Sequence, residues 1–92
     1  MAKVIVTAKV KDTAAWEAGF RSLTAVLSSI FVSPINLGIN TGDSSFAYLA
    51  EVKDLDQFLA TINSERIQQV QKENGVVDGS VRVYVLDKPV EF

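Results

Sequence analysis

Residues 44–52 read SSFAYLAEV, and this short stretch decides the fold. Its composition predicts a strand, and Phe46 and Tyr48 stand two residues apart. Side chains two apart in a strand point to the same face of the sheet, so the two rings lie together. On an open sheet such a pair is a platform for stacking RNA bases. On a covered sheet it is the wall of a protein core or of a dimer interface. The rest of the sequence is needed to choose between these interpretations.

Before this stretch the sequence predicts a strand, a helix and a second strand. Residues 3–10 are rich in β-branched residues and predict the first strand. Asp12 or Thr13 is placed to cap a helix. Apolar residues then recur at steps of four and three, the spacing of one helix face: Trp16, Phe20, Leu23, Leu27 and Ile30. Pro34 interrupts the next apolar run, so we predict a strand from about Ile35 to Asn40.

After this stretch the sequence predicts helical segments and a last strand. Asp54 is placed to cap a helix, and Ser64 to cap a further helical piece that ends at Asn74-Gly75. Residues 81–86 predict the final strand. The order βαββαβ is that of a ferredoxin-like sandwich, an α+β fold with a four-stranded antiparallel sheet and helices on one face. No linker or repeat interrupts it, so we predict one domain over residues 1–92.

The composition excludes several classes of function. The chain has no histidine and no cysteine, which excludes thiolate nucleophiles, histidine-dependent zinc or haem sites and serine–histidine pairs. We therefore expect no metal and no cofactor. Nine Lys and Arg face 11 Asp and Glu, without the basic cluster that nucleic-acid binding needs. No apolar run is long enough to span a membrane, and we expect a cytoplasmic protein.

Both faces of the predicted sheet carry apolar residues. Alternation puts Val4, Val6 and Val83 on one face, and Ile5, Tyr84 and Leu86 on the other. The second face also receives either the Phe46 and Tyr48 pair or Leu49. A sheet face that meets only solvent would alternate with polar residues throughout. Large exposed apolar patches mark interaction sites, so we expect a partner to cover the second face.

Single-stranded RNA is one candidate for the partner that covers the second face. The segment Phe46-Ala47-Tyr48-Leu49 is similar to part of the third-strand signature of RNA-recognition motifs. However, Ser44 and Ser45 stand where that signature has a basic residue and a glycine, and the first strand has no aromatic residue. The acidic chain and the long helical segment after Asp54 also argue against RNA. We therefore place RNA binding last among the alternatives and predict no nucleic-acid partner.

A second copy of the same sheet is the other candidate, and here the chain resembles a known superfamily. The resemblance to the dimeric α/β-barrel superfamily, which includes antibiotic-biosynthesis monooxygenase-like and stress-responsive proteins, covers residues 3–87. It rests on Asp12-x-x-x-Trp16-x-x-x-Phe20, Gly42-Asp43, Glu51-Val52-x-Asp54, Phe58, Asn63-Ser64 and Gly75-Val76. It implies a homodimer in which two sheets pack face to face. It also implies a pocket between sheet and helices, in which some members oxidise aromatic polyketides without a cofactor.

Residues of the types that such enzymes use to hold a phenol are present, although no diagnostic spacing connects them. The candidates for a ligand pocket are Trp16, Asn40, Tyr48, Arg82 and Tyr84, with Asn36 as a weaker one. Each also has a structural interpretation: core or interface for the aromatic residues, turn or edge for the asparagines. For Arg82 it is an ion pair with Glu51. No residue is assigned a catalytic role, and no carboxylate pair has the spacing of a metal site.

Three functions follow in order of preference. The first is a homodimer that binds a small apolar or aromatic molecule between sheet and helices, with no nucleic-acid or membrane partner. The second is a cofactor-independent monooxygenase-like enzyme, and the third is RNA binding. The enzyme needs an enclosed pocket in which Trp16, Tyr48, Arg82 or Tyr84 has a polar group without a protein partner. RNA binding needs Phe46 and Tyr48 exposed on an open sheet.

Overall fold

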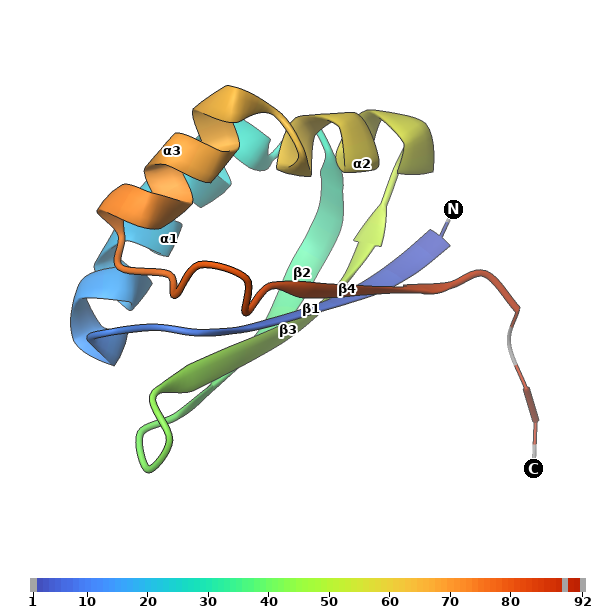
Figure 1. Cartoon of the computed structure of the whole chain (residues 1–92). Coiled ribbons are helices and arrows are strands. Elements are labelled where there is room, and N and C mark those ends of the chain that lie inside the picture. Colours follow the sequence, from blue (N-terminus) through green and yellow to red (C-terminus); the bar gives the residue numbers. More distant parts are fainter. Residues whose placement is uncertain (1, 89, 92) are drawn as a thin grey trace.

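The computed structural model describes residues 2–88 and 90–91, without the side chains of residues 24–27 and 33. The predicted place of Leu27 on the first helix face lies outside these described side chains. The elements follow one another as predicted, with the second helical segment divided in two (Figure 1). They are β1 (Ala2–Lys9), α1 (Thr13–Leu27), β2 (Phe31–Asn40), β3 (Ser45–Val52), α2 (Leu55–Ile62), α3 (Glu65–Glu73) and β4 (Arg82–Leu86).

The four strands form one antiparallel sheet in the order β2-β3-β1-β4. The helices cover one face of this sheet, and the opposite face carries no element of the described chain (Figure 1). This order and layering confirm the predicted ferredoxin-like fold. The two central strands, β1 and β3, supply half of the buried hydrophobic residues of the described chain, and Val4, Val6, Ala50 and Val52 among them are almost fully buried.

Side-chain caps begin the three helices where the sequence predicts them. The Asp12 carboxylate accepts hydrogen bonds from the backbone N–H groups of Ala14 and Ala15 at 2.9 and 3.2 Å. The Asp54 carboxylate accepts from the N–H of Gln57 at 3.1 Å. Ser64 accepts from the N–H of Ile67 at 3.3 Å, which begins α3 and confirms the predicted break after α2. These acceptors satisfy N–H groups that a helix leaves without internal partners.

Strand β2 differs from the prediction, because it begins at Phe31 rather than near Ile35. Its pairing with β3 shifts register between Val32 and Asn36, and Pro34 lies inside this irregular stretch. β2 is also an edge strand. An edge strand with a bulge tolerates a residue that cannot donate a backbone hydrogen bond, so proline interrupts the ladder without ending the strand.

The two rings of β3 lie on the helix-covered face of the sheet. Phe46 and Tyr48 are each only 6% exposed and belong to the core cluster, whereas Ala47 and Leu49 lie on the open face. The position of the pair, which alternation alone left undecided, is therefore under the helices. RNA bases cannot stack on buried rings, so the RNA-stacking hypothesis is wrong.

Candidate functional site

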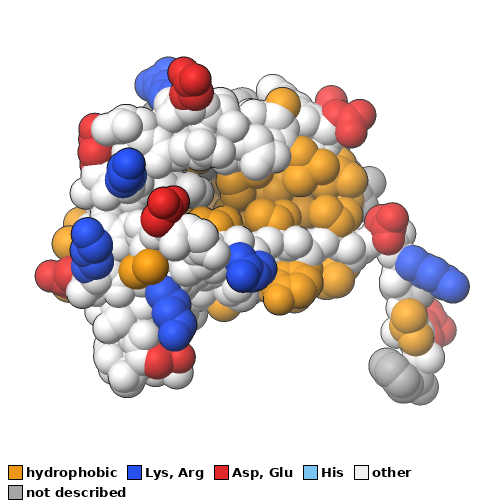
Figure 2. All heavy atoms as spheres, viewed as in Figure 1, with side chains coloured by type: hydrophobic (Ala, Val, Ile, Leu, Met, Phe, Trp, Pro, Cys, Tyr) orange, Lys and Arg blue, Asp and Glu red, His pale blue; other side chains and the backbone are white. Residues whose placement is uncertain are grey.

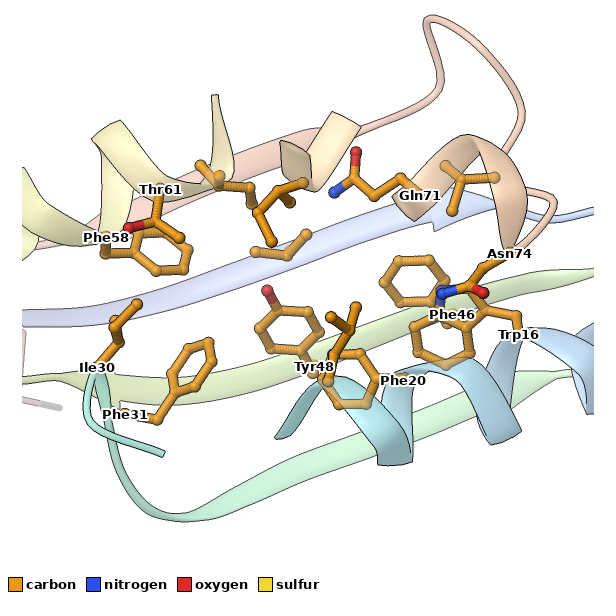
Figure 3. A pocket seen from close by; sticks show the side chains of 15 residues that line it. Trp16, Phe20, Ile30, Phe31, Phe46, Tyr48, Phe58, Thr61, Gln71 and Asn74 are labelled. Carbon is orange, nitrogen blue, oxygen red and sulfur yellow. The ribbon is translucent and has the colours of Figure 1, made fainter. Parts of the chain in front are cut away.

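An aromatic-walled pocket lies between the sheet and the helices (Figure 3). The rings come from α1, β2, β3 and α2, so four elements far apart in sequence build one wall. They are Trp16, Phe20, Phe31, Phe46, Tyr48 and Phe58. We call this space the inner pocket. Two of its residues, Trp16 and Tyr48, are among the pocket candidates predicted from the sequence.

Three of these rings, Trp16, Phe46 and Tyr48, lie in nearly parallel planes, whereas Phe20 is tilted by 39° against Tyr48. The ring centroids of Trp16 and Phe46 are 3.8 Å apart with an interplanar angle of 13°. Phe46 and Tyr48 differ by only 5° in ring plane, and Trp16 and Phe20 by 22°. Phe31 instead meets Tyr48 edge-on, at 89°. Trp16 and Phe46 therefore stack face to face, and Phe31 presents its edge to Tyr48.

Aliphatic side chains complete the wall and make the pocket small. They are Val6, Leu23, Ile30, Ile62, Ile67 and Val76. The free volume is about 50 Å³. For comparison, an engineered apolar cavity of roughly 150 Å³ binds benzene. The inner pocket in this conformation therefore holds less than one aromatic ring, and a ligand has to displace side chains to enter.

The Tyr48 hydroxyl is the most informative group in the pocket. Tyr48 is 6% exposed, and no described residue gives its hydroxyl a hydrogen bond. Among the described residues, no polar side-chain atom that is completely sealed from solvent lacks a partner. The Tyr48 oxygen therefore faces the free space of the pocket, as Figure 3 shows. Burial raises the pKa of this hydroxyl well above its ordinary value of 10.0, so the group stays protonated and can donate.

Four other neutral polar groups line the inner pocket. Trp16 is 3% exposed, and its indole N–H has no partner among the described residues. The side chains of Thr61, Gln71 and Asn74 also line the pocket, again without a hydrogen bond from the described chain. Sequence reasoning missed these three. Thr61 and Gln71 carry no local signal, and Asn74 stood out only as a helix stop.

Asn74 reaches the pocket because Gly19 has no side chain. A Cβ built on Gly19 would lie 2.4 to 2.5 Å from the three outer atoms of the Asn74 amide group. Ordinary van der Waals contact begins at 3.4 Å. The Asn74 amide thus occupies the space that a side chain at position 19 would fill, and it connects the end of α3 to α1.

A larger groove lies beside the inner pocket, between α3 and β4. Its volume is about 610 Å³, which is within the usual range for ligand sites. Figure 2 shows apolar side chains gathered in the hollow between the helix layer and β4. Ile62, Gln71 and Val76 line both spaces and therefore form the partition between them. Movement of these side chains is the shortest way to enlarge the inner pocket.

The other predicted pocket residues lie away from the inner pocket. Arg82 and Tyr84 are on the open face of β4, where the Tyr84 side chain is 52% exposed. Asn40 ends β2, and its side-chain oxygen accepts from the N–H groups of Gly42 and Asp43. Asn36 is exposed in the same strand. The structure therefore brings together Trp16 and Tyr48, and separates them from these four residues.

The predicted ion pair between Arg82 and Glu51 is wrong. Glu51 lies opposite Lys3 in the sheet, whereas Arg82 lies opposite Thr7. The Arg82 guanidinium instead donates to the carbonyl oxygens of Gly79 and Val81, at 2.9 and 3.0 Å. Arg82 therefore supports the loop before β4.

Two further features are absent from the part of the chain that the structure describes. No helix there is long and apolar enough to cross a bilayer. No group of three or more Asp and Glu side chains there is placed to hold a metal ion.

Solved structures similar to this chain are antibiotic-biosynthesis monooxygenase-like proteins. One, described as an antibiotic biosynthesis monooxygenase, has 16% sequence identity and a TM-score of 0.70, over 98% of this chain and 100% of its own. SnoaB from Streptomyces nogalater, described as a cofactor-independent oxygenase, has 14% identity and a TM-score of 0.71, over 98% and 94%. Rv0793 from Mycobacterium tuberculosis has 15% identity and a TM-score of 0.67, over 98% and 96%.

No protein-family model matches the chain, and no curated protein matches it. The structural likeness extends over nearly the whole of each chain, at identities that support a shared fold. The resemblance found in the sequence is therefore confirmed at the level of the fold.

Proposed function

We propose that this protein binds a small aromatic molecule in the inner pocket. The observation that carries the proposal is the Tyr48 hydroxyl, which is buried, faces free space and has no partner in the described chain. A hydroxyl held at 6% exposure without a protein hydrogen bond loses part of its hydration, which costs up to about 1–3 kcal/mol. A phenylalanine would fill the same place between the rings without that cost. A ligand that forms a hydrogen bond with the hydroxyl would explain why a tyrosine, and not a phenylalanine, occupies this position.

Isothermal titration calorimetry with acetophenone and 2-acetylnaphthalene tests this proposal, because the two ketones represent one-ring and two-ring ligands. Ile67→Phe fills the inner pocket from α3, and we expect it to weaken binding at least about tenfold. Arg66→Phe adds the same ring to the exposed side of α3, outside both cavities, and we expect wild-type affinity. The proposal is wrong if neither ketone binds, or if both variants behave alike.

Cofactor-independent oxygenation is the second candidate, and the shared fold with SnoaB favours it. Without a cofactor the substrate itself has to supply the electrons. One O₂ then converts a ring CH₂ to C=O and its second oxygen atom leaves as water, so the substrate gives four electrons. Anthrone, a three-ring ketone with such a CH₂ group, is a suitable probe in an oxygen electrode. We expect protein-dependent oxygen uptake that falls in Ile67→Phe, and uptake equal to the protein-free control contradicts this candidate.

We further propose that the protein is a homodimer through its open sheet face. Tyr84, Ile5 and Leu49 lie side by side across β4, β1 and β3, and they form an apolar row on that face. A chain of 92 residues has a small core, and burial of this row in a second copy would add to it. The chain is acidic and the row is uncharged, so a second copy of the same row fits better than a basic or an acidic partner.

Sedimentation analysis tests the dimer. We expect a dimer for the wild type and a monomer for Leu49→Lys, because the substitution puts a charge in the centre of the interface. Gln69→Lys adds the same charge on the exposed side of α3 and should leave the dimer intact. A monomeric wild type overturns the homodimer proposal.

A further inference from the structure

We propose that Asn74 is a deamidation site that the folded chain protects, that it reacts only when the end of α3 opens, and that its modification leaves α3 loosened. Asn74 is the C-cap of α3, and Gly75 follows it with a φ of 82°, a conformation that favours glycine. The turn thus requires an Asn-Gly pair, in which asparagine deamidates most readily because glycine has no side chain to hinder attack by its backbone nitrogen. The site lies in the wall of the inner pocket but needs no ligand, so it goes beyond the proposed binding function.

Deamidation at this pair joins the main chain to the Asn74 side chain. The backbone nitrogen of Gly75 attacks the Asn74 Cγ, so that a new C–N bond forms and the bond from Cγ to Nδ2 breaks. The Nδ2 group leaves as ammonia and takes the proton that the Gly75 nitrogen gives up. One water molecule then opens the resulting succinimide ring at either carbonyl carbon. The product is aspartate, or isoaspartate in which the main chain runs through the side chain, and no oxidant or reductant is needed.

The backbone of the folded chain keeps the attacking nitrogen away from the side chain. Asn74 has a ψ of 4°, which places the Gly75 nitrogen in line with the Asn74 backbone nitrogen, whereas ring closure needs it in line with Cβ. Hydrogen bonds of Gly75 oppose the rotation. Its N–H donates to the Lys72 carbonyl at 3.1 Å, and its carbonyl accepts from the Lys11 N–H at 2.8 Å. The ring therefore cannot close until these bonds break.

Packing holds the Asn74 side chain as well. Its amide occupies the space beside Gly19 that a larger residue on α1 would fill. Figure 3 shows this amide at the same end of the inner pocket as Trp16. An amide packed in this way cannot turn freely to meet the Gly75 nitrogen. Opening the end of α3 releases the backbone and the side chain together, and α3 has no buried residue that would oppose it.

The modified residue does not suit the folded position. A carboxylate at residue 74 stands at the C-terminal end of α3, where the helix carbonyls already carry partial negative charge. No Asp, Glu, Lys or Arg lines the inner pocket, and Lys72 in the last turn of α3 is exposed, so solvent screens its attraction. Isoaspartate also lengthens the main chain and moves Gly75 away from its hydrogen-bond partners. We therefore expect α3 to stay loosened after modification.

Peptide mapping by mass spectrometry, after incubation at pH 7, measures the fraction of Asn74 that has gained the mass of deamidation. A synthetic peptide of residues 69–80 gives the rate without the fold. Only open molecules react, and a minor open state holds about 0.1–10% of a population, so the folded chain should react at least about tenfold more slowly. The neighbouring Asp78-Gly79 pair forms the same ring without a net change of mass, so it does not interfere.

A glycine variant tests the contact that holds the amide. Gly19→Ala puts a methyl group where the amide lies and should raise the Asn74 rate at least about threefold, toward that of the peptide. Gly38→Ala is the matched control, because its new Cβ meets nothing within 4 Å, and it should keep the wild-type rate. Asn74→Asp reproduces one product and should speed hydrogen exchange in α3, while exchange in β1 stays as in the wild type.

Three results would each overturn the proposal, and none of them depends on ligand binding. Equal rates in the folded chain and the peptide would show that the fold gives no protection, and this comparison needs no variant. A wild-type rate in Gly19→Ala, or an equal increase in Gly38→Ala, would show that the contact at Gly19 does not protect the site. Unchanged exchange in Asn74→Asp would show that modification leaves α3 in place.

Discussion

The contact between Gly19 and Asn74 gives the sharpest test of the structure. In Gly19→Ala the new Cβ would stand 2.4 Å from the Asn74 amide carbon and oxygen, about 1 Å inside ordinary contact distance. The Asn74 amide has to move, and the three atoms concerned are the outer end of its side chain. Overfilling a packed site costs about 1–3 kcal/mol. Alanine in place of glycine within a helix gains about 1 kcal/mol, so the single variant should range from neutral to about 2 kcal/mol less stable.

A double-mutant cycle isolates the contact from the change in helix propensity. Asn74→Ala removes the amide, so Gly19→Ala in that background should keep only the gain, about 1 kcal/mol of added stability. The difference between the two backgrounds is the coupling energy, which we expect to be about 1–3 kcal/mol.

Urea unfolding gives these free energies directly. The single tryptophan, Trp16, is 3% exposed and stacked on Phe46, so its fluorescence reports unfolding of the core around the contact. Circular dichroism should give the same midpoint if unfolding is two-state. If Gly19→Ala changes stability equally in both backgrounds, within about 0.5 kcal/mol, the reasoning from the contact between positions 19 and 74 is refuted.

Five further predictions concern the inner pocket and the helices above it. Tyr48→Phe should raise the free energy of unfolding by about 1 kcal/mol, because an unpaired buried hydroxyl is removed. The wild type should lose stability above pH 10, where only the unfolded chain loses the Tyr48 proton, and Tyr48→Phe should lack that Tyr48-dependent part of the loss. Ser64→Ala removes the cap of α3 and should cost about 1 kcal/mol in chemical denaturation. In hydrogen exchange, α3 should exchange faster than β1, because α3 has no buried residue, and equal protection contradicts this. Ile62→Ala opens the partition and should favour 2-acetylnaphthalene over acetophenone in calorimetry.

The architecture could be predicted because each element has a local cause. Asp12, Asp54 and Ser64 are short polar side chains directly before helical patterns, and each accepts the hydrogen bonds that a helix start leaves unpaired. The turn after β2 is equally local, since Asn40 accepts from two N–H groups within three residues. Effects that act over a few residues are visible in the order of residues.

The site could be predicted only in part, because it depends on contacts between distant segments. Trp16 and Tyr48 stood out as residue types that bind phenols. Gln71 and Thr61 have no such signal, and they reach the pocket only because α2 and α3 fold over the sheet. Arg82 looked suited to a partner, but the register puts it opposite Thr7 on the other face. Alternation along a strand gives two faces and does not say which one the helices cover.

Because the helices cover the face that carries Phe46 and Tyr48, the two residues can be compared directly, and they differ in role. Both rings fill the core to the same degree, at 6% exposure, and their planes differ by only 5°. That packing alone explains why a phenylalanine occupies position 46. Tyr48 adds a hydroxyl that packing does not use, and its burial raises the pKa so that the group stays a neutral donor. If the hydroxyl served only the fold, its removal would leave ligand binding unchanged. Weaker binding of 2-acetylnaphthalene by Tyr48→Phe, with stability kept or raised, would show that this position serves binding at the expense of the core.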